Sequence, residues 1–342
     1  MNSYPFEMGP IRPVDEADSL LIRTTRGCPW NRCTFCTLYK DMNFSLRSVP
    51  EIKKDILAAR DYFNGHGFET CFLQDGDSFV MKTRDLIEVL DCLTRAFPSL
   101  KRISSYGRAQ TMAKKSLPDM KEIRAAGLNK LYSGMESGSA QVLKNIKKGI
   151  TPESIIHSAY LARESGMDMT QFIILGVGGR ELSKTHALET AEVLNQINPD
   201  HIRVLTIGVK SESGLGRQMA KGEFTLPSEK EIIEEQRILL EKLHGITSHY
   251  ANHHSVDLLL ELRGRLPQDK SRLLDVLDHF LGLDPSAQTN FVLGRRLGYY
   301  RQLSDMADEN LYQFVEKQAD KIRKEGKESF EEIFHRLRKQ VI

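Results

Sequence analysis

The chain has 342 residues, of which 40% are hydrophobic and 27% charged, and its formal net charge is +2. This length suits one large domain, or a large domain with a smaller one, and a core of this size needs no disulfides to stabilise it. No apolar run reaches the roughly 18 residues that a membrane-spanning helix needs, and the near-neutral charge argues against a strongly electrostatic nucleic-acid binder.

The first 18 residues are polar, contain three prolines and show no signal-peptide pattern. Five cysteines occur, three of them clustered. Such cysteine usage fits a reducing compartment, so we expect a cytoplasmic location and no disulfide bonds.

From Ser19 to Gly208, short apolar runs alternate with helical periodicity. The predicted strands are 19–24, 70–74, 102–106, 128–132, 169–175 and 201–207. A helix follows each of the first five strands, and the first helix starts at a capping box, Ser48-Val49-Pro50-Glu51. Strand–helix units at this spacing predict an α/β fold with a parallel sheet and right-handed crossovers.

After Ser211 the pattern becomes mainly helical, with periodic segments at 232–243, 270–281 and 309–342. We therefore predict three parts: an N-terminal extension (1–17), an α/β barrel (18–227) and a C-terminal helical region (228–342). The tail Lys317–Lys339 carries both charge signs and is interpreted as a solvated helix face. His249–His254 is predicted to be a loop with solvated imidazoles that could contact a substrate, with a metal site as the alternative.

The stretch from Cys28 to Cys36 carries three cysteines in the spacing C-x4-C-x2-C, and Gly27 opens it. Three thiolates on one short loop can converge on a single soft metal centre. A [4Fe–4S] cluster held by Cys28, Cys33 and Cys36 would keep one iron free of protein ligands, and chemistry could occur there.

The spacing alone is also compatible with a zinc site or with plain buried thiols. A structural zinc site needs four ligands, and the fourth could be His66 or a distant residue. We interpret the two remaining cysteines, Cys71 and Cys92, as core thiols.

The cysteine loop resembles the cluster loop of the radical S-adenosylmethionine (radical SAM) superfamily. The usual form there is C-x3-C-x-aromatic-C; Phe35 takes the aromatic position, and one extra residue lies between Cys28 and Cys33. The resemblance implies a partial (β/α)6 barrel. In such folds the turns at the carboxyl ends of the strands gather at one mouth, where ligands bind.

The segment Gly134-Met135-Glu136-Ser137-Gly138, followed by Lys147-Lys148-Gly149, resembles a G-x-E-S-G…K-G stretch of many radical SAM enzymes. By this resemblance, Glu136 would meet the ribose hydroxyls or other polar groups of the nucleotide. Lys148 would meet the methionyl carboxylate, with an ordinary surface lysine as the alternative.

The turn Asp75-Gly76-Asp77 stands where the superfamily often has Gly-Gly-Glu, whose backbone meets the methionyl amino group. Gly76 permits close backbone approach, and Asp75 or Asp77 could accept from the ammonium; an ordinary Asp-Gly turn is the alternative. Arg108 could bind the nucleotide or a substrate acid. By resemblance, the turn at Gly176 flanks adenine, although the pattern also fits a buried strand that simply ends in a loop.

The implied activity is the [4Fe–4S]-dependent reductive cleavage of S-adenosylmethionine to a 5′-deoxyadenosyl radical, which abstracts hydrogen from a small-molecule substrate. A one-electron donor such as flavodoxin or ferredoxin would be required. The chain looks nearest to the branch with oxygen-independent coproporphyrinogen oxidases, but Ser211–Leu215 lacks that branch's common Pro-Gly-Thr, so the porphyrin activity is not carried over.

Only about 18 residues precede the first strand, so no cobalamin domain is expected before the barrel. Two further functions are compatible with the sequence. One is a radical modifier of tRNA or protein. The other is a non-catalytic zinc or iron–sulfur barrel that acts as an interaction or sensor protein.

Overall fold

The computed structural model describes residues 4–65 and 67–340, so His66 lies outside the described residues. The described chain divides into two compact units. Unit 1 contains the residues up to Met135 together with Gly149–Gln171; unit 2 contains Glu136–Lys148 and the residues from Phe172 onward. The predicted boundaries at 17/18 and 227/228 stay predictions.

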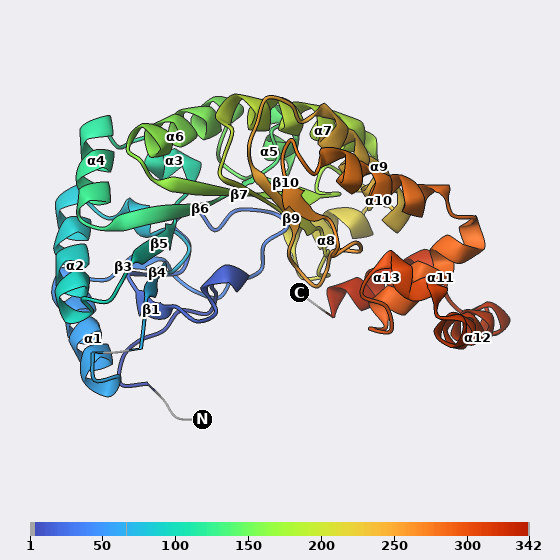
Figure 1. The fold of residues 1–342 in the computed structure, drawn as a ribbon, viewed down its shortest axis with the longest axis horizontal. Helices are drawn as coiled ribbons and strands as arrows, with labels where there is room; N and C mark the ends of the chain where they lie inside the picture. Colours follow the sequence, from blue (N-terminus) through green and yellow to red (C-terminus); the bar gives the residue numbers. More distant parts are fainter. Residues whose placement is uncertain (1–3, 66, 341–342) are drawn as a thin grey trace. The chain divides into compact units, whose positions relative to one another are not determined.

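Unit 1 is built from strands that alternate with helices (Figure 1). Its strands are β1 (Leu20–Arg23), β2 (Thr25–Arg26), β3 (Ser45–Leu46), β4 (Thr70–Gln74), β5 (Arg102–Tyr106) and β6 (Leu128–Glu136), whose last residue belongs to unit 2. Its helices are η1 (Val14–Glu16), α1 (Val49–Tyr62), η2 (Ser78–Val80), α2 (Thr83–Ala96), α3 (Ala109–Met112), α4 (Leu117–Ala125) and α6 (Pro152–Glu164).

The remaining elements lie in unit 2, apart from the first half of β7, which belongs to unit 1. The strands are β7 (Asp168–Leu175), β8 (His201–Thr206), β9 (His249–Asn252) and β10 (Arg263–Arg265). The helices are α5 (Ala140–Asn145), α7 (Gly179–Ile197), α8 (Gly214–Ala220), α9 (Glu229–Lys242), α10 (Lys270–Gly282), α11 (Pro285–Arg296), η3 (Leu303–Ala307), α12 (Glu309–Glu325) and α13 (Phe330–Lys339).

The strand order of the main sheet is β1-β4-β5-β6-β7-β8-β9-β10. Pairs β1–β4, β4–β5, β5–β6 and β8–β9 are parallel, whereas β10 runs antiparallel to β9. The predicted α/β class with a parallel sheet is confirmed. In Figure 1, helices α1, α2 and α4 lie along one side of the strands of unit 1.

Local signals in the sequence set many element boundaries. Strands β4 and β5 begin and end where the sequence predicts. Helix α1 starts at the predicted capping box, in which Ser48 and Glu51 each accept from the other's backbone N–H. These features depend on residues a few positions apart, so sequence alone is enough to locate them.

Glu16 anchors the segment that precedes the first strand, and its carboxylate is fully buried in unit 1. Glu16 accepts hydrogen bonds from Arg102, the Ser104 hydroxyl and the Tyr132 hydroxyl, at 3.1, 2.8 and 2.7 Å. Since those partners lie on β5 and β6, the segment at Glu16 is tied to the sheet of unit 1.

The prediction of a loop at His249–His254 is wrong for its first four residues, which form β9. Helix α9 covers one face of this strand. There the Gln236 amide donates to the Tyr250 hydroxyl at 2.8 Å and to the Asn252 side-chain oxygen at 2.6 Å. The polar side chain of Asn252 is therefore satisfied in the interior, a pairing that local sequence does not reveal.

The charged tail is not solvated throughout, contrary to its interpretation from sequence. Arg338 in α13 is 1% exposed and donates to buried Glu229 at the start of α9, as does Arg296 in α11. Burial alone would raise the pKa of Glu229, but the two guanidiniums lower it to about 2. This ion cluster joins three helices of unit 2.

No helix in the described part of the chain has the length and apolar character needed to cross a membrane.

Candidate active site

The three clustered cysteines lie on a loop without regular secondary structure between β2 and β3 in unit 1. None of Cys28, Cys33 and Cys36 is in a disulfide, and all three are partly exposed. Gly27 opens the loop at φ +77°, in the left-handed region that favours glycine. The thiols are therefore accessible to a ligand.

Asp75, directly after β4, holds this loop in place. It is fully buried, and its Oδ2 accepts from the Gly27 backbone N–H at 3.1 Å and from Arg23 Nη2 at 2.6 Å. Its Oδ1 accepts from the Tyr39 hydroxyl at 2.6 Å. Burial and the bond to Asp75 raise the pKa of Tyr39, so the phenol remains a donor. Both carboxylate oxygens thus bind protein groups, which favours a positioning role over direct contact with an ammonium.

Gly76 brings the backbone after β4 close to the cysteine loop. A Cβ at this position would lie 3.2 Å from Cys28 Cβ and 3.2 Å from the Gly27 carbonyl oxygen. Such contacts are tighter than side chains normally make, so a larger residue would displace the loop.

Asp77 is buried and fixes the segment that carries Arg108. Its Oδ1 accepts from the Arg108 backbone N–H at 3.4 Å, and its Oδ2 accepts from the Thr111 hydroxyl at 2.7 Å. Burial raises the pKa of Asp77 to about 6 despite these bonds.

Trp30 joins the cysteine loop to two further segments of unit 1. The guanidinium carbons of Arg32 and Arg108 each lie 5.3 Å from the centroid of its ring, within cation–π range. A Cβ at Gly149, where φ is +71°, would overlap the same ring. The structure therefore brings Arg108 together with the cysteine loop through Trp30.

Glu136 and Lys148, both in unit 2, lie together as an ion pair. Lys148 Nζ donates to Glu136 Oε1 at 2.6 Å, and both side chains are largely buried. Glu136 ends β6 at φ +60°, a conformation that is costly for a residue other than glycine and that occurs often at functional sites.

The Ser137-Gly138 segment after Glu136 packs against α7. The Ser137 hydroxyl lies 2.8 Å from His186 Nδ1, and the Gly138 N–H donates to the Thr190 hydroxyl at 2.8 Å. A Cβ at Gly138 would overlap the α7 backbone. Glycine is therefore required here for close approach.

The turn at Gly176 is held by Glu235 of α9. Glu235 Oε1 accepts from the Gly176 N–H at 2.7 Å, and its Oε2 accepts from the Ser183 hydroxyl at 2.6 Å. His186 Nε2 lies 3.6 Å from Glu235 Oε1. Burial raises the pKa of Glu235 to about 7 and lowers that of His186 to about 4. One buried network thus supports the Glu136–Gly138 segment and the Gly176 turn.

Sequence reasoning missed His186, Glu235 and the anchoring role of Asp75. Glu235 stands in the apolar stripe of its helix, between Ile232 and Leu239, and all three side chains are buried. A carboxylate at such a position is a recognisable signal of a buried polar network.

The donor set of the loop fits an iron–sulfur cluster. Across residues 4–65 and 67–340, no three His, Cys, Asp or Glu side chains are grouped as ligands for a single metal ion. A [4Fe–4S] cluster makes a different demand, because each cysteine binds a different iron. Cys28, Cys33 and Cys36 supply three accessible thiols, none of them in a disulfide.

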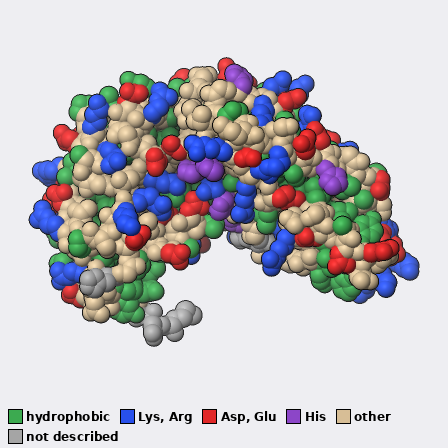
Figure 2. Space-filling model, viewed as in Figure 1, with side chains coloured by type: hydrophobic (Ala, Val, Ile, Leu, Met, Phe, Trp, Pro, Cys, Tyr) green, Lys and Arg blue, Asp and Glu red, His purple; other side chains and the backbone are tan. Residues whose placement is uncertain are grey.

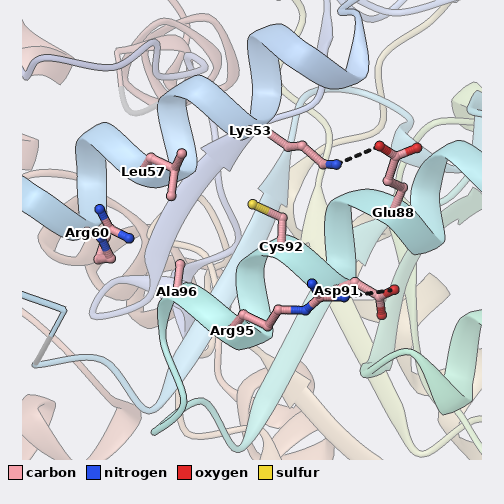
Figure 3. Close-up of a pocket in the computed structure, with 8 residues that line it drawn as sticks. All are labelled: Lys53, Leu57, Arg60, Glu88, Asp91, Cys92, Arg95 and Ala96. Atoms are coloured by element: carbon pink, nitrogen blue, oxygen red, sulfur yellow. Dashed lines mark hydrogen bonds and ion pairs between the residues drawn. The ribbon is translucent and has the colours of Figure 1, made fainter.

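The two remaining cysteines differ in their surroundings. Cys71 is fully buried, as predicted for a core thiol. Cys92 is only half-buried, so its interpretation as a core thiol is wrong; its side chain faces a surface depression of about 310 Å³ between α1 and α2 (Figure 3). Charged residues surround this depression, and Lys53 pairs with Glu88 across it at 2.5 Å.

Comparison with protein families identifies the class. The model of the radical SAM superfamily matches residues 22–194, just over half of the chain. The chain therefore belongs to the radical SAM superfamily. It is an enzyme, and its cofactors are a [4Fe–4S] cluster and S-adenosylmethionine.

Two curated relatives are similar over about half of the chain. An uncharacterized methyltransferase of Pyrococcus horikoshii is 26% identical over 185 residues, covering 52% of this chain and 38% of that protein. Heme chaperone HemW of Bacillus subtilis is 23% identical over 182 residues, covering 52% of this chain and 47% of that protein. The matched region thus spans less than half of each relative.

Two solved structures share the fold. The cobalamin-dependent S-adenosylmethionine radical enzyme OxsB matches with a TM-score of 0.53 at 15% identity, covering 94% of this chain and 58% of that one. The radical S-adenosylmethionine methyltransferase TsrM from Kitasatospora setae matches with a TM-score of 0.50 at 16% identity, covering 88% of this chain and 61% of that one. At these identities the likeness concerns the fold alone.

Proposed function

We propose that Cys28, Cys33 and Cys36 hold the [4Fe–4S] cluster and that the enzyme generates a 5′-deoxyadenosyl radical, which abstracts hydrogen from a small-molecule substrate. The observation that carries this proposal is the loop itself. Three partly exposed thiols, none of them in a disulfide, lie on a segment that Asp75 fixes to the end of β4, in a chain of the radical SAM superfamily.

The chain's own residues position the reacting groups. When bound, the reduced cluster supplies one electron for homolytic cleavage of the nucleotide's sulfonium bond. Asp75 and Tyr39 keep the cysteine loop in one conformation, and Gly76 lets the backbone after β4 approach Gly27 and Cys28 closely. A fixed loop limits the reorganisation that binding requires.

The individual nucleotide contacts remain proposals. Glu136, Lys148 and Gly176 are the candidates in unit 2, and Gly76, Asp77 and Arg108 are the candidates in unit 1. The Glu136–Lys148 pair offers a carboxylate that can accept from a diol and an ammonium that can meet a carboxylate. Asp75 is placed among the positioning residues, because both its oxygens are already bonded.

The reaction needs a one-electron reductant, and we propose flavodoxin or ferredoxin for this role. The cytoplasmic location stays a prediction.

Anaerobic reconstitution with iron and sulfide, followed by dithionite and S-adenosylmethionine, tests the proposal. The expected product is 5′-deoxyadenosine, measured by liquid chromatography and mass spectrometry. Cys36→Ala should lose iron and product, whereas Cys92→Ala, at the surface depression of α2, should retain both. Absence of 5′-deoxyadenosine from the unaltered protein with its cluster in place would refute the proposal.

A further inference from the structure

One carboxylate of the N-terminal segment meets three arginines at the base of the cysteine loop in unit 1. Glu7 Oε1 accepts from Arg23 Nη1 at 2.8 Å and from Arg26 Nε at 2.8 Å. Its Oε2 accepts from Arg26 Nη2 at 2.6 Å and lies 3.5 Å from Arg47 Nε. The two parallel bonds from Arg26 have the geometry of a strong arginine–carboxylate pair.

Two of these arginines stand at the ends of the cysteine loop, which we define as residues 27–44. Arg26 ends β2 and directly precedes Gly27, and Arg47 directly follows β3. Strands β2 and β3 pair antiparallel through only two residues each. A two-stranded ladder of this length is marginal by itself, so closure of the loop depends on further contacts. Glu7 supplies such contacts, because it meets an arginine from each end.

The third arginine connects Glu7 to the Asp75 anchor. Arg23 is buried and donates both to Glu7 and to Asp75 Oδ2. The same Asp75 oxygen accepts from the Gly27 N–H. A chain of hydrogen bonds thus runs from Glu7 through Arg23 and Asp75 to the first residue of the cysteine loop.

The segment that carries Glu7 is itself fastened to unit 1. The Glu7 backbone N–H donates to the Asp55 carboxylate of α1 at 3.1 Å, and the Gly9 N–H donates to the Gln74 side-chain oxygen at 2.8 Å. A Cβ at Gly9 would lie 3.0 Å from Asp75 Oδ1, so the segment packs directly on the anchor. Glu7 therefore meets the arginines from a backbone that is held in place.

Glu7 also balances charge at the base of the loop. The hydrogen bonds from Arg26, together with the charges of Arg47 and Arg23, lower the pKa of the Glu7 carboxyl, so it is ionised at neutral pH. Without Glu7, Arg26 would pair among the described residues only with Glu51, at 3.5 Å. Three cations would remain close together, and their repulsion would favour separation of the loop ends.

We infer that Glu7 is a positioning residue for the iron–sulfur cluster: it ties the two ends of the cysteine loop together and so keeps the three thiols in the arrangement that binds the cluster. This inference rests on the proposed function, which assigns the cluster to these thiols. Glu7 acts through the three arginines. Iron is lost when the loop opens, so a loop that opens less often should hold its iron for longer.

Iron release from the anaerobically reconstituted protein tests the inference. The ferrous chelator bathophenanthroline disulfonate is added in excess, and the absorbance of its iron complex gives the rate. Glu7→Ala should release iron about tenfold faster than the unaltered protein, because the charge-assisted bonds from Arg26 are lost. Glu7→Gln keeps an oxygen for one of these bonds but loses the charge, so its rate should lie between the two.

Glu69→Ala is the matched control. Glu69 also pairs with a cation in unit 1, Lys101 at 2.7 Å, but it is exposed and directly precedes β4, whereas the cysteine loop is anchored at the other end of that strand. Figure 2 shows Lys, Arg, Asp and Glu side chains interspersed over the visible face of unit 1, where Figure 1 places α1, α2 and α4. Exposed ion pairs contribute little, so this variant should release iron like the unaltered protein.

Hydrogen–deuterium exchange separates positioning of the loop from a general loss of stability. In Glu7→Gln, the amides of residues 27–44 should exchange faster, whereas those of α2 should keep the rate of the unaltered protein. At equal iron content, the electron paramagnetic resonance spectrum of the reduced cluster should broaden, because the loop adopts more than one arrangement. A uniform rise in exchange over unit 1 would overturn the inference.

Two further results would overturn it. One is equal iron release by the unaltered protein and both Glu7 variants. The other is an acceleration in Glu69→Ala as large as that in Glu7→Ala. The proposed function fails by different results, namely absence of 5′-deoxyadenosine from the unaltered protein or retention of iron in Cys36→Ala, so each idea can fail without the other.

Discussion

In each unit a buried carboxylate holds a segment of the candidate site in place. The carboxylate of unit 1 is paired with a cation, whereas that of unit 2 bonds to neutral donors. In unit 1, Asp75 fixes Gly27 and bonds to a cation, Arg23, at 2.6 Å. In unit 2, Glu235 fixes Gly176 and bonds to the neutral Ser183 hydroxyl. A cation offsets the cost of burying a negative charge, whereas neutral donors offset it only in part. The two anchors should therefore respond differently to substitution and to pH.

The largest effect is expected for Asp75→Ala. The substitution leaves the buried Arg23 guanidinium with Glu7 as its remaining carboxylate and removes the acceptor of the Gly27 N–H and the Tyr39 hydroxyl. Removal of one partner from a buried pair costs about 3–5 kcal/mol. Urea unfolding should show this loss, and bound iron per protein after reconstitution should fall because the cysteine loop is released.

Asp91→Ala is the control for Asp75→Ala. Asp91 faces Arg95 at 4.0 Å on the surface of α2, so the cost should stay under about 1 kcal/mol with iron content unchanged. Similar losses in the two variants would contradict the anchoring role of Asp75.

Substitution of Glu235 should have a smaller effect. Glu235→Leu leaves the Gly176 N–H and the Ser183 hydroxyl without their acceptor, at a cost of roughly 1–3 kcal/mol for an unsatisfied buried group. Glu235→Gln keeps an amide oxygen for Gly176 and should recover much of the loss. Urea unfolding measures the stability, and calorimetry measures S-adenosylmethionine affinity. If Gln and Leu behave alike, the hydrogen bond to Gly176 does not matter.

The pH dependence provides a sharper test of the unit 2 anchor. The folded pKa of Glu235 is raised to about 7, so the folded state binds the proton more tightly than the unfolded state does. The contribution of this protonation to the free energy of unfolding is complete at low pH and is lost as pH rises from about 4.5 to 7. The pKa of His186 is lowered from 6.5 to about 4. Its contribution to the free energy of unfolding therefore increases with pH over this interval, which overlaps that of Glu235. The two effects oppose each other in the unaltered protein.

Glu235→Gln removes one of these opposing effects. We compare the free energy of unfolding of the variant with that of the unaltered protein at each pH. This difference should favour the variant by about 2–3 kcal/mol more at pH 8 than at pH 5. Groups common to both proteins cancel in this comparison. Urea unfolding of both proteins at the two pH values measures it, and a pH-independent difference would show that Glu235 titrates normally.

The two spare cysteines of unit 1 should differ from each other, and the smallest effect of all is expected at Cys92. Cys71→Ser places a hydroxyl in a fully buried position and should cost about 1–3 kcal/mol. Cys92→Ser, at the surface depression, should change stability by no more than about 0.5 kcal/mol. Iron content should stay unchanged in both variants. Loss of iron in either variant would question whether the clustered cysteines are the only ligands.

The sequence by itself determined much of the fold and the chemical class of the site. The capping box at Ser48, the alternation of strands and helices, and the C-x4-C-x2-C spacing each depend on residues close together in the chain. Local periodicity and backbone capping are set by near neighbours, so these features could be predicted, and β4 and β5 even with their boundaries. The same motifs predicted the family, and the match of the family model to residues 22–194 confirms it.

Only the tertiary structure decided which polar groups support those motifs. Asp75 meets Gly27 across 48 positions, and Glu235 meets Gly176 across 59. The pairing of β9 with β8 and β10 joined segments far apart in the sequence, and Glu229 pairs with Arg338, a buried arginine of the charged tail. A buried polar group is stable only beside its partner, and the fold, not the local sequence, brings distant partners together.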